Sequence, residues 1–230
     1  MDKALGQDDQ SKANINTATE GLLRQHLEER LVDSDLLSQR QAGRHRFSPD
    51  LSYGRHFSPP FSDSKPAAVM ILLEKREHQW SIPLTVRPQH LPDHPGQISF
   101  PGGRIEGEES AEQAAIREFE EELGVAFSGD ILGELQALFV YNSNYAVRPF
   151  VAIRSSESPS ISYDPCVHEV ERLIHLPITT LTDVSCHPLK GFRRGRVNWK
   201  ARVIQYQKDQ VWGATAIMLG ELAACLKGLG

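Results

Sequence analysis

Apolar residues in this chain fall into short runs separated by polar turns, and these runs predict a sheet. Residues 67–73 form a continuous apolar run, as expected for a strand buried on both faces. After a polar turn over residues 74–79, residues 80–86 predict a second strand. Further strand-like segments are residues 132–140, 147–153, 167–176 and 197–207.

Helical spacing of apolar residues predicts helices around these strands. Thr19 can cap an N-terminal helix. Its apolar face is made by Leu23, Leu27 and Leu31. Residues 177–181 predict a short helical turn, residues 214–226 predict a closing helix, and residues 43–66 predict an irregular connection. Because the predicted helices interleave with strands, we expect an α/β layered fold.

One predicted helix carries an unusual set of carboxylates. Ser110 and Gln113 have the spacing of a capping box, and Gly124 suits the position that ends a helix. The buried stripe expected between them is Ala111, Ala114, Ala115, Ile116, Phe119 and Leu123.

The carboxylates of Glu118, Glu121 and Glu122 share one face of this helix because they lie three and four residues apart. Like charges at this spacing destabilise a helix and raise one another's pKa. A hard divalent cation such as Mg²⁺ or Mn²⁺ resolves the conflict, because it binds carboxylate oxygens and keeps waters for a phosphate ligand. The alternative is a solvated acidic face without function.

The spacing around these glutamates resembles the signature of the Nudix hydrolases. Gly103, Glu109 and Arg117 precede the glutamates at the family's offsets, and Gly124 follows them. The resemblance implies a Nudix α/β/α sandwich with a mixed sheet and a loop–helix–loop metal site. It also implies hydrolysis of a nucleoside diphosphate linked to another group. The residues it implicates in catalysis are the metal ligands Glu118, Glu121 and Glu122, and a salt-bridged pair, Arg117 and Glu109, that braces the loop. An ordinary helix-surface pair with Glu121 is the alternative for Arg117.

Residues 83–103, PLTVRPQHLPDHPGQISFPGG, resemble the second signature of the coenzyme A pyrophosphatase branch of this family. The matching positions are Leu84, Thr85, Arg87, Leu91, His94, Gly96, Gln97, Phe100, Pro101, Gly102 and Gly103. The chain departs from the signature at Pro83, Pro88 and Pro92. The last of these stands where arginine is usual, which removes one phosphate contact. Weaker similarity downstream extends the resemblance to about residues 19–226.

This narrower resemblance implies hydrolysis of coenzyme A or its thioesters to 4′-phosphopantetheine, or its acyl form, and adenosine 3′,5′-bisphosphate. Arg87 and Gln97 are candidates to hold phosphate or pantetheine oxygens, and the backbone of Gly102 and Gly103 can face a diphosphate. Satisfied loop residues and a plain tight turn are the alternatives. Glu169, on a strand-like segment, is a candidate for an extra metal ligand or the base; a strand-edge surface glutamate is the alternative for Glu169, and a helix glutamate is the alternative for the base. Loop histidines His90 and His94 are weaker phosphate candidates, and Trp212 is expected to pack the final helix.

The basic segment over residues 190–202 offers cations for the adenosine 3′-phosphate in place of the arginine missing at Pro92. We single out Arg193 and Arg194, with a solvated basic hairpin as the alternative reading. Another nucleoside diphosphate, such as ADP-ribose or NADH, is an alternative substrate. A non-catalytic nucleotide or RNA-binding module is an alternative function, whose surface would be Lys190, Arg193, Arg194, Arg196, Lys200 and Arg202.

Composition sets broader limits on function. The 230 residues carry a formal charge of −5, so there is no global basic field for nucleic acid. Three scattered cysteines favour a reducing cytosol, and no apolar run is long enough for a signal peptide or a membrane span. We expect a cytoplasmic protein with a small-molecule nucleotide substrate of the coenzyme A type, with a homodimer left open. Residues 1–16 are expected to be a disordered polar tail and residues 17–230 a single domain that includes the N-terminal helix.

Overall fold

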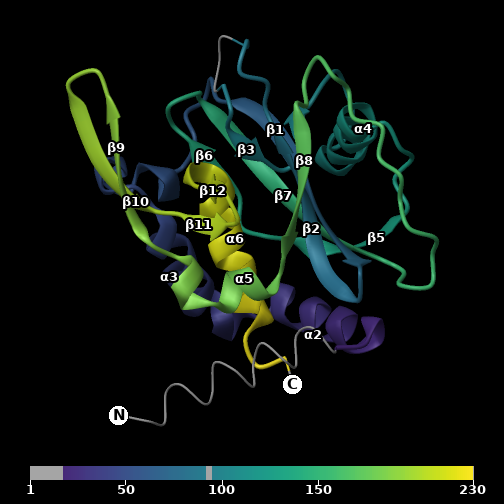
Figure 1. Cartoon of the computed structure of the whole chain (residues 1–230). Coiled ribbons are helices and arrows are strands. Elements are labelled where there is room, and N and C mark those ends of the chain that lie inside the picture. Colours follow the sequence, from purple (N-terminus) through teal and green to yellow (C-terminus); the bar gives the residue numbers. More distant parts are fainter. Residues whose placement is uncertain (1–17, 92–94, 230) are drawn as a thin grey trace.

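The structure of the chain is a computed structural model that describes residues 18–91 and 95–229 (Figure 1). The polar tail expected over residues 1–16 lies outside the described residues, as do Pro92 and His94 of the coenzyme A signature.

The centre of the fold is a mixed sheet built around strand β1 (Lys65–Arg76). One edge of β1 pairs in parallel with β7 (Tyr145–Arg154), and the other edge is shared by β2 (Gln79–Val86) and β4 (Gly102–Arg104), both antiparallel. The outer strands are β3 (Ile98–Ser99) and β8 (Arg172–Pro177) beside β2, and β5 (Gly129–Glu134) and β6 (Leu138–Val140) beside β7. Parallel strands need a crossover, and the one between β1 and β7 contains helix α4 (Ala111–Leu123).

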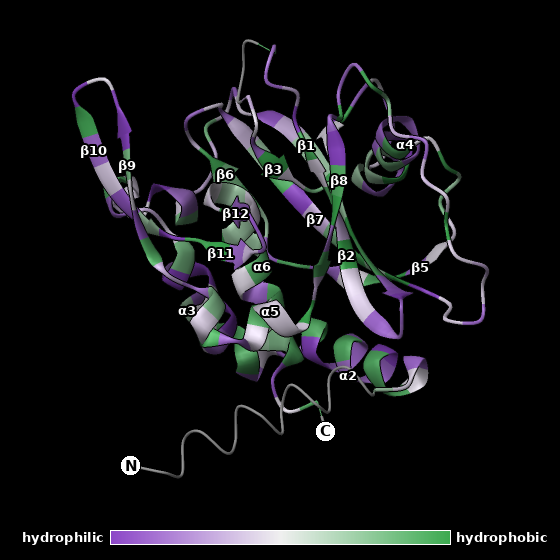
Figure 2. Ribbon diagram, in the orientation of Figure 1, coloured by the Kyte–Doolittle hydropathy of each residue, from purple (hydrophilic) through white to green (hydrophobic). Residues whose placement is uncertain are grey.

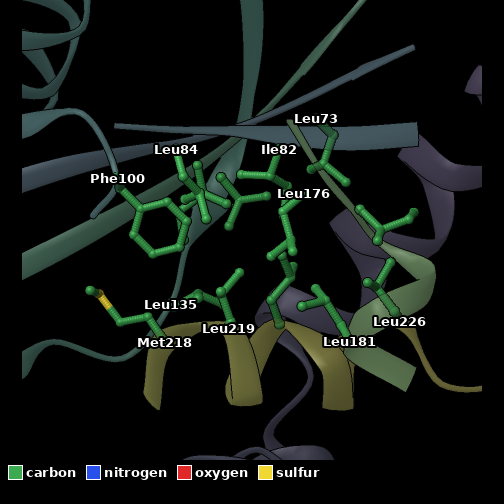
Figure 3. Close-up of a cluster of buried hydrophobic side chains, with 14 of the residues drawn as sticks. Leu73, Ile82, Leu84, Phe100, Leu135, Leu176, Leu181, Met218, Leu219 and Leu226 are labelled. Atoms are coloured by element: carbon green, nitrogen blue, oxygen red, sulfur yellow. The ribbon is translucent and has the colours of Figure 1, made fainter. Parts of the chain in front are cut away.

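Side chains of β1 alternate between two hydrophobic layers, which confirms the expected α/β/α sandwich. Ala68, Met70 and Leu72 pack toward α4. Ile71 and Leu73 point into the larger core on the other face. That core lies between the sheet and α6 (Gly213–Leu226), where Leu219 and Leu226 meet Ile82 and Leu84 (Figure 3). Hydrophobic residues recur along the central strands and α6, between polar ones (Figure 2).

The predicted N-terminal helix is α2 (Glu20–Val32), and the Thr19 hydroxyl caps it by accepting a hydrogen bond from Leu22 N at 3.3 Å. Its leucines are buried as expected. Helix α3 (Leu37–Phe47) enters the region that we expected to be irregular. Three short 3₁₀ turns flank it at Ser34–Leu36, Asp50–Ser52 and Arg55–Phe57.

Helix α3 escaped prediction because its buried face is polar and small rather than apolar. Arg40 and Arg44 are buried and reach the buried Glu221 of α6 at 2.8 and 3.4 Å. Between them, Gly43 lies directly against Gly220, where an added Cβ would come 2.1 Å from the Gly220 carbonyl oxygen. A helix that packs through ion pairs and glycine shows no apolar periodicity.

This close helix crossing gives a stability prediction. Gly43→Ala should lower the free energy of unfolding by about 1–3 kcal/mol, because the α3 backbone must move away from α6. Gly21→Ala in α2 is the matched control: among the described residues nothing lies within 4 Å of its Cβ position, so the lower entropy of the unfolded chain should stabilise it slightly. Chemical denaturation of both variants measures the difference. Equal stability of the two variants would contradict the described helix contact.

Several predicted boundaries were wrong. Residues 132–140 are two strands, β5 and β6, and residues 197–207 are also two, β10 (Val197–Arg202) and β11 (Ile204–Tyr206). The predicted strand over residues 167–176 begins only at Arg172. The turn predicted over residues 74–79 consists only of Glu77 and His78, both with positive φ. The strands β1 and β2 on either side are longer than predicted and pair as a hairpin up to this turn. The remaining elements are α5 (Thr179–Thr182), a 3₁₀ turn at Val184–Cys186, β9 (Leu189–Arg194) and β12 (Asp209–Val211).

Within the described residues, no helix has both the length and the apolar character needed to cross a membrane.

Candidate functional site

Helix α4 has the boundaries that its sequence predicts. The Ser110 Oγ accepts from Gln113 N at 3.1 Å, and the Gln113 side chain accepts from Ser110 N at 2.8 Å, which completes the capping box. Gly124 ends the helix in the left-handed region, with φ 64°. Because Phe119 and Leu123 are fully buried against the sheet, the orientation of the acidic face is fixed.

The two glycines of β4 bring backbone close to this acidic face. An added Cβ on Gly103 would lie 2.3 Å from Glu118 Oε1, and one on Gly102 would lie 2.4 Å from the Ala68 carbonyl oxygen. Gly102 also has φ 156°, which side chains rarely allow. Its backbone N–H lowers the pKa of Glu122 through a hydrogen bond. Both positions therefore require glycine, and both lie against the glutamates.

Arg117 joins the loop to the helix, as the resemblance implied. Its Nη2 and Nε donate to the two carboxylate oxygens of Glu109, at 2.8 and 3.1 Å, and Nη2 also donates to the Arg104 carbonyl oxygen at 3.0 Å. The alternative helix-surface contact is present too, because Nη1 lies 3.0 Å from both Glu118 and Glu121. The single guanidinium thus holds a carboxylate of the loop and two of the helix.

The buried end of the acidic face is electrostatically unfavourable for two ionised carboxylates. Burial raises the pKa of Glu122 to about 8, and the charges of Glu118 and Glu169 add to the rise. Burial also raises the pKa of Glu118, against the lowering effect of Arg117. Glu122 Oε2 is buried and has no hydrogen-bond partner among the described residues.

These features fit a cation, although a complete ligand shell is not formed. Within residues 18–91 and 95–229, no three His, Cys, Asp or Glu side chains are grouped closely enough to hold a metal ion. Glu118 and Glu122 supply two adjacent carboxylates and one unpartnered oxygen, which a divalent ion would satisfy. Glu121 is 59 % exposed and paired with Arg117, so it would have to exchange that contact for the ion.

Glu169 also reaches this face, but from a turn rather than from the strand we predicted. Cys166 N donates to the Glu122 carbonyl oxygen and Asp164 N to that of Leu123, both at 3.0 Å, so this segment caps the end of α4. Glu169 is exposed, and its charge raises the pKa of Glu122. The strand prediction failed because this segment forms a turn, in which Glu169 N and Val170 N both donate to the Cys166 carbonyl oxygen, and Val167 is 75 % exposed.

Arg87 acts on the site from the sheet, and Gln97 is its backbone hydrogen-bond partner. They lie at the facing ends of β2 and β3, where Arg87 N donates to the Gln97 carbonyl oxygen at 2.9 Å. The cationic side chain of Arg87 lowers the pKa of Glu122, so it acts on the acidic face. His90 is exposed in the loop that follows β2.

The structure does not bring Arg193 and Arg194 to the glutamates. Both are exposed on β9, in a two-stranded hairpin with β10 that stands out from the body on the side away from α4 (Figure 1). Trp212, which we expected only to pack the final helix, also contacts this hairpin: its ring centroid lies 4.8 Å from that of Phe192. Sequence patterns gave no signal for this contact.

The chain is similar to a known domain family and to named proteins from bacteria. A family model described as the NUDIX domain matches residues 64–186. A protein of Enterobacter sp. (strain 638), named "Uncharacterized Nudix hydrolase NudL", is 34% identical over 197 residues, covering 84% of this chain and 94% of the relative. The protein of that name from Escherichia coli (strain K12) is 34% identical over 160 residues, covering 68% and 80%.

Solved structures give a weaker likeness. A MutT/nudix family protein from Enterococcus faecalis has a TM-score of 0.42 and 16% identity, covering 89% of this chain and 73% of that one. The NUDIX domain of Shewanella oneidensis NrtR, complexed with ADP ribose, has a TM-score of 0.42 and 19% identity, covering 56% and 83%. The family-model match and the two relatives show that the chain belongs to the Nudix hydrolase family of pyrophosphohydrolases, which act on nucleoside diphosphate derivatives.

Proposed function

We propose that this Nudix hydrolase cleaves the diphosphate of coenzyme A or acyl-coenzyme A. The products would be 4′-phosphopantetheine, or its acyl form, and adenosine 3′,5′-bisphosphate. The observation that carries the reaction type is the pair Glu118 and Glu122, whose pKa values are both raised by burial, with the unpartnered Oε2 of Glu122, beside the Gly102–Gly103 backbone. The signature over residues 83–103 supports the choice of substrate.

Nudix hydrolases generally need a divalent metal such as Mg²⁺ or Mn²⁺. In this chain Glu118, Glu121 and Glu122 would hold it, and when bound it would neutralise the diphosphate and lower the pKa of a bound water. Arg117 and Glu109 position the helix carboxylates relative to the loop through their bidentate pair.

The substrate would be held by residues of the sheet and of the loops at its strand ends, which would face the glutamates of α4. Arg87 offers a cation for a phosphate oxygen, and its charge already acts on Glu122. Gln97 offers an amide for phosphate or pantetheine oxygens. The backbone at Gly102 and Gly103 lies directly against the sheet and the carboxylates, because there is no side chain at either position, and its N–H groups could face a diphosphate.

We propose Glu169 as the base that takes the proton from the attacking water. Its carboxylate is exposed, and its charge reaches both Glu118 and Glu122. The helix glutamates are the alternative, but they would be occupied as metal ligands. A base must lie within hydrogen-bond reach of the water, and an exposed side chain from the turn beside the end of α4 could satisfy this.

The raised pKa of Glu122 predicts that metal affinity depends on pH. A metal competes with the proton of a carboxylic acid, so Mn²⁺ should bind about tenfold or more tightly at pH 8.5 than at pH 6.5. The rise should level off above the pKa of about 8. Titration calorimetry with Mn²⁺ at several pH values measures this effect, and Glu122→Gln should flatten the profile. A wild-type affinity that does not change over this range would contradict the described environment of Glu122.

We also propose that residues 17–230 form one domain in a cytoplasmic protein. Leu23, Leu27 and Leu31 of α2 belong to the same core as β2, which supports one domain. Cys166 and Cys225 are free cysteines, which supports a reducing compartment. The proposed partner is the nucleotide substrate alone; sedimentation velocity decides between a monomer and the homodimer that we leave open.

Product identification tests the reaction directly. Coenzyme A incubated with Mn²⁺ should yield adenosine 3′,5′-bisphosphate and 4′-phosphopantetheine in equal amounts by chromatography, and EDTA should stop the reaction. Binding of coenzyme A without turnover in Mn²⁺ would instead support a non-catalytic nucleotide-binding module.

A further inference from the structure

The β9–β10 hairpin carries a row of aromatic rings on one of its faces. In its register Phe192 pairs directly with Trp199, and their rings are stacked with centroids 5.6 Å apart and planes 12° from parallel. Side chains alternate between the two faces of a strand, so Lys190 and Arg194 share the face of Phe192. Arg193 lies on the opposite face, where its Nε donates to the Gly195 carbonyl oxygen at 3.1 Å.

Trp212 completes a three-ring cluster with this pair. Its centroid lies 4.8 Å from that of Phe192 and 6.3 Å from that of Trp199. All three rings are partly exposed. We call Phe192, Trp199 and Trp212, with the flanking Lys190 and Arg194, the aromatic face.

Charge at the aromatic face favours an anionic ligand. Residues 189–202 contain six Lys or Arg residues and no acidic residue, although the whole chain carries −5. Lys190 and Arg194 each lie two residues from Phe192, or about 7 Å along the strand. An aromatic ring with a cation on either side suits one nucleobase with its phosphates.

The aromatic face is connected to the candidate catalytic site through β3. Trp212 immediately precedes α6, and the Thr215 hydroxyl of that helix donates to the Ile98 carbonyl oxygen of β3 at 3.0 Å. Ile98 follows Gln97, which accepts the backbone hydrogen bond of Arg87. Trp212 and Gln97 therefore each lie within three residues of this hydrogen bond between α6 and β3, which places the aromatic face next to β3.

We propose that the aromatic face binds the nucleoside end of the substrate, with the base against Phe192, Trp199 and Trp212 and the 3′-phosphate on Arg194 or Lys190. This inference rests on the proposed function, because it takes the substrate to be adenosine 3′-phosphate linked through a diphosphate. A single nucleotide fits better than a polynucleotide. Of the other cations in the hairpin, Arg193, Lys200 and Arg202 lie on the opposite face and Arg196 lies in the turn between the strands, so they do not form a row that one strand of phosphates could follow across the rings.

Tryptophan fluorescence tests this proposal without turnover. Of the three tryptophans, Trp80 is 0% exposed, so a ligand-dependent signal reports on Trp199 and Trp212. Adenosine 3′,5′-bisphosphate added to the full chain in the absence of divalent metal should quench this signal saturably. Phe192→Leu and Arg194→Gln should each weaken the binding by about tenfold, whereas Lys200→Gln, which removes one charge from the opposite face, should not.

Steady-state kinetics separates this proposal from the proposed function. With coenzyme A, Phe192→Leu should raise KM by about tenfold and leave kcat within about twofold, because the ring binds substrate remote from the reacting phosphorus. Unchanged KM together with no quenching would overturn the aromatic-face proposal and leave coenzyme A hydrolysis standing. Quenching without coenzyme A hydrolysis would retain a nucleotide site and reject the proposed function. Two other results would overturn the aromatic-face proposal. One is binding of a single-stranded oligonucleotide to the hairpin more tightly than the bisphosphate, and the other is self-association that buries these rings.

Discussion

Glu122→Gln should reduce kcat for diphosphate hydrolysis by at least about a thousandfold, or about 4 kcal/mol in activation free energy. Glu122 is the most buried carboxylate of the acidic face, and its unpartnered Oε2 is the oxygen that a cation would satisfy. The amide keeps the shape of the side chain but removes its negative charge. Glu121→Gln should also abolish turnover if Glu121 leaves Arg117 to bind the metal.

The same substitution should not destabilise the metal-free protein. The pKa of Glu122 rises from 4.5 to about 8 on folding, so its contribution to stability is present below the lower value and is lost as pH rises through the upper one. Glu122→Gln has no such loss, and above about pH 8 it should melt at the same temperature as the metal-free wild type or higher.

Glu120→Gln is the matched control for these variants. Glu120 is exposed on the neighbouring position of α4, and its Oε1 accepts a hydrogen bond from Phe127 N at 2.8 Å, a role that an amide oxygen can keep. Its turnover should stay near the wild-type rate. If Glu121→Gln and Glu122→Gln both kept wild-type rates at saturating Mg²⁺, the assignment of the acidic face as the metal site would be wrong.

Gly103→Ala should lower kcat/KM by about a hundredfold or more. The new methyl group would come within 2.3 Å of the Glu118 carboxylate, so either that carboxylate or the β4 backbone must move. A displacement of about 1 Å in a catalytic group costs about this much activity. Gly21→Ala, a glycine substitution in open space among the described residues, should leave activity unchanged.

Mn²⁺ affinity shows whether Gly103→Ala lowers kcat/KM by displacing Glu118. Gly103→Ala and Glu118→Ala should each weaken Mn²⁺ binding, and the double variant should bind no more weakly than the worse of the two, because both changes remove the same ligand. Fully additive losses would show that the glycine acts on the site by another route.

Local signals made α4 predictable from the sequence. Its start is fixed by hydrogen bonds between Ser110 and Gln113, three residues apart, and its end by the positive φ of Gly124. The pair Arg117 and Glu109 was accessible only through the family resemblance, because nothing in the spacing alone distinguishes a brace from a surface pair. The structure contains both contacts.

Contacts between distant segments were not predictable in this way. Helix α3 packs through Arg40, Arg44 and Gly43, whose partners in α6 lie up to 181 residues away along the chain. Glu169 reaches the acidic face because backbone hydrogen bonds of its turn cap the end of α4. In each case the polar side chain acquires its role from tertiary packing, which hydrophobic periodicity does not encode.

The most direct test of the proposed substrate compares kcat/KM for coenzyme A, dephospho-coenzyme A, ADP-ribose and NADH in Mn²⁺. A charge-assisted contact with the 3′-phosphate contributes about 1.5–3 kcal/mol, so coenzyme A should exceed dephospho-coenzyme A by about tenfold. Coenzyme A should also exceed ADP-ribose and NADH. A higher kcat/KM for ADP-ribose or NADH would contradict the coenzyme A proposal and leave a Nudix hydrolase for another nucleoside diphosphate.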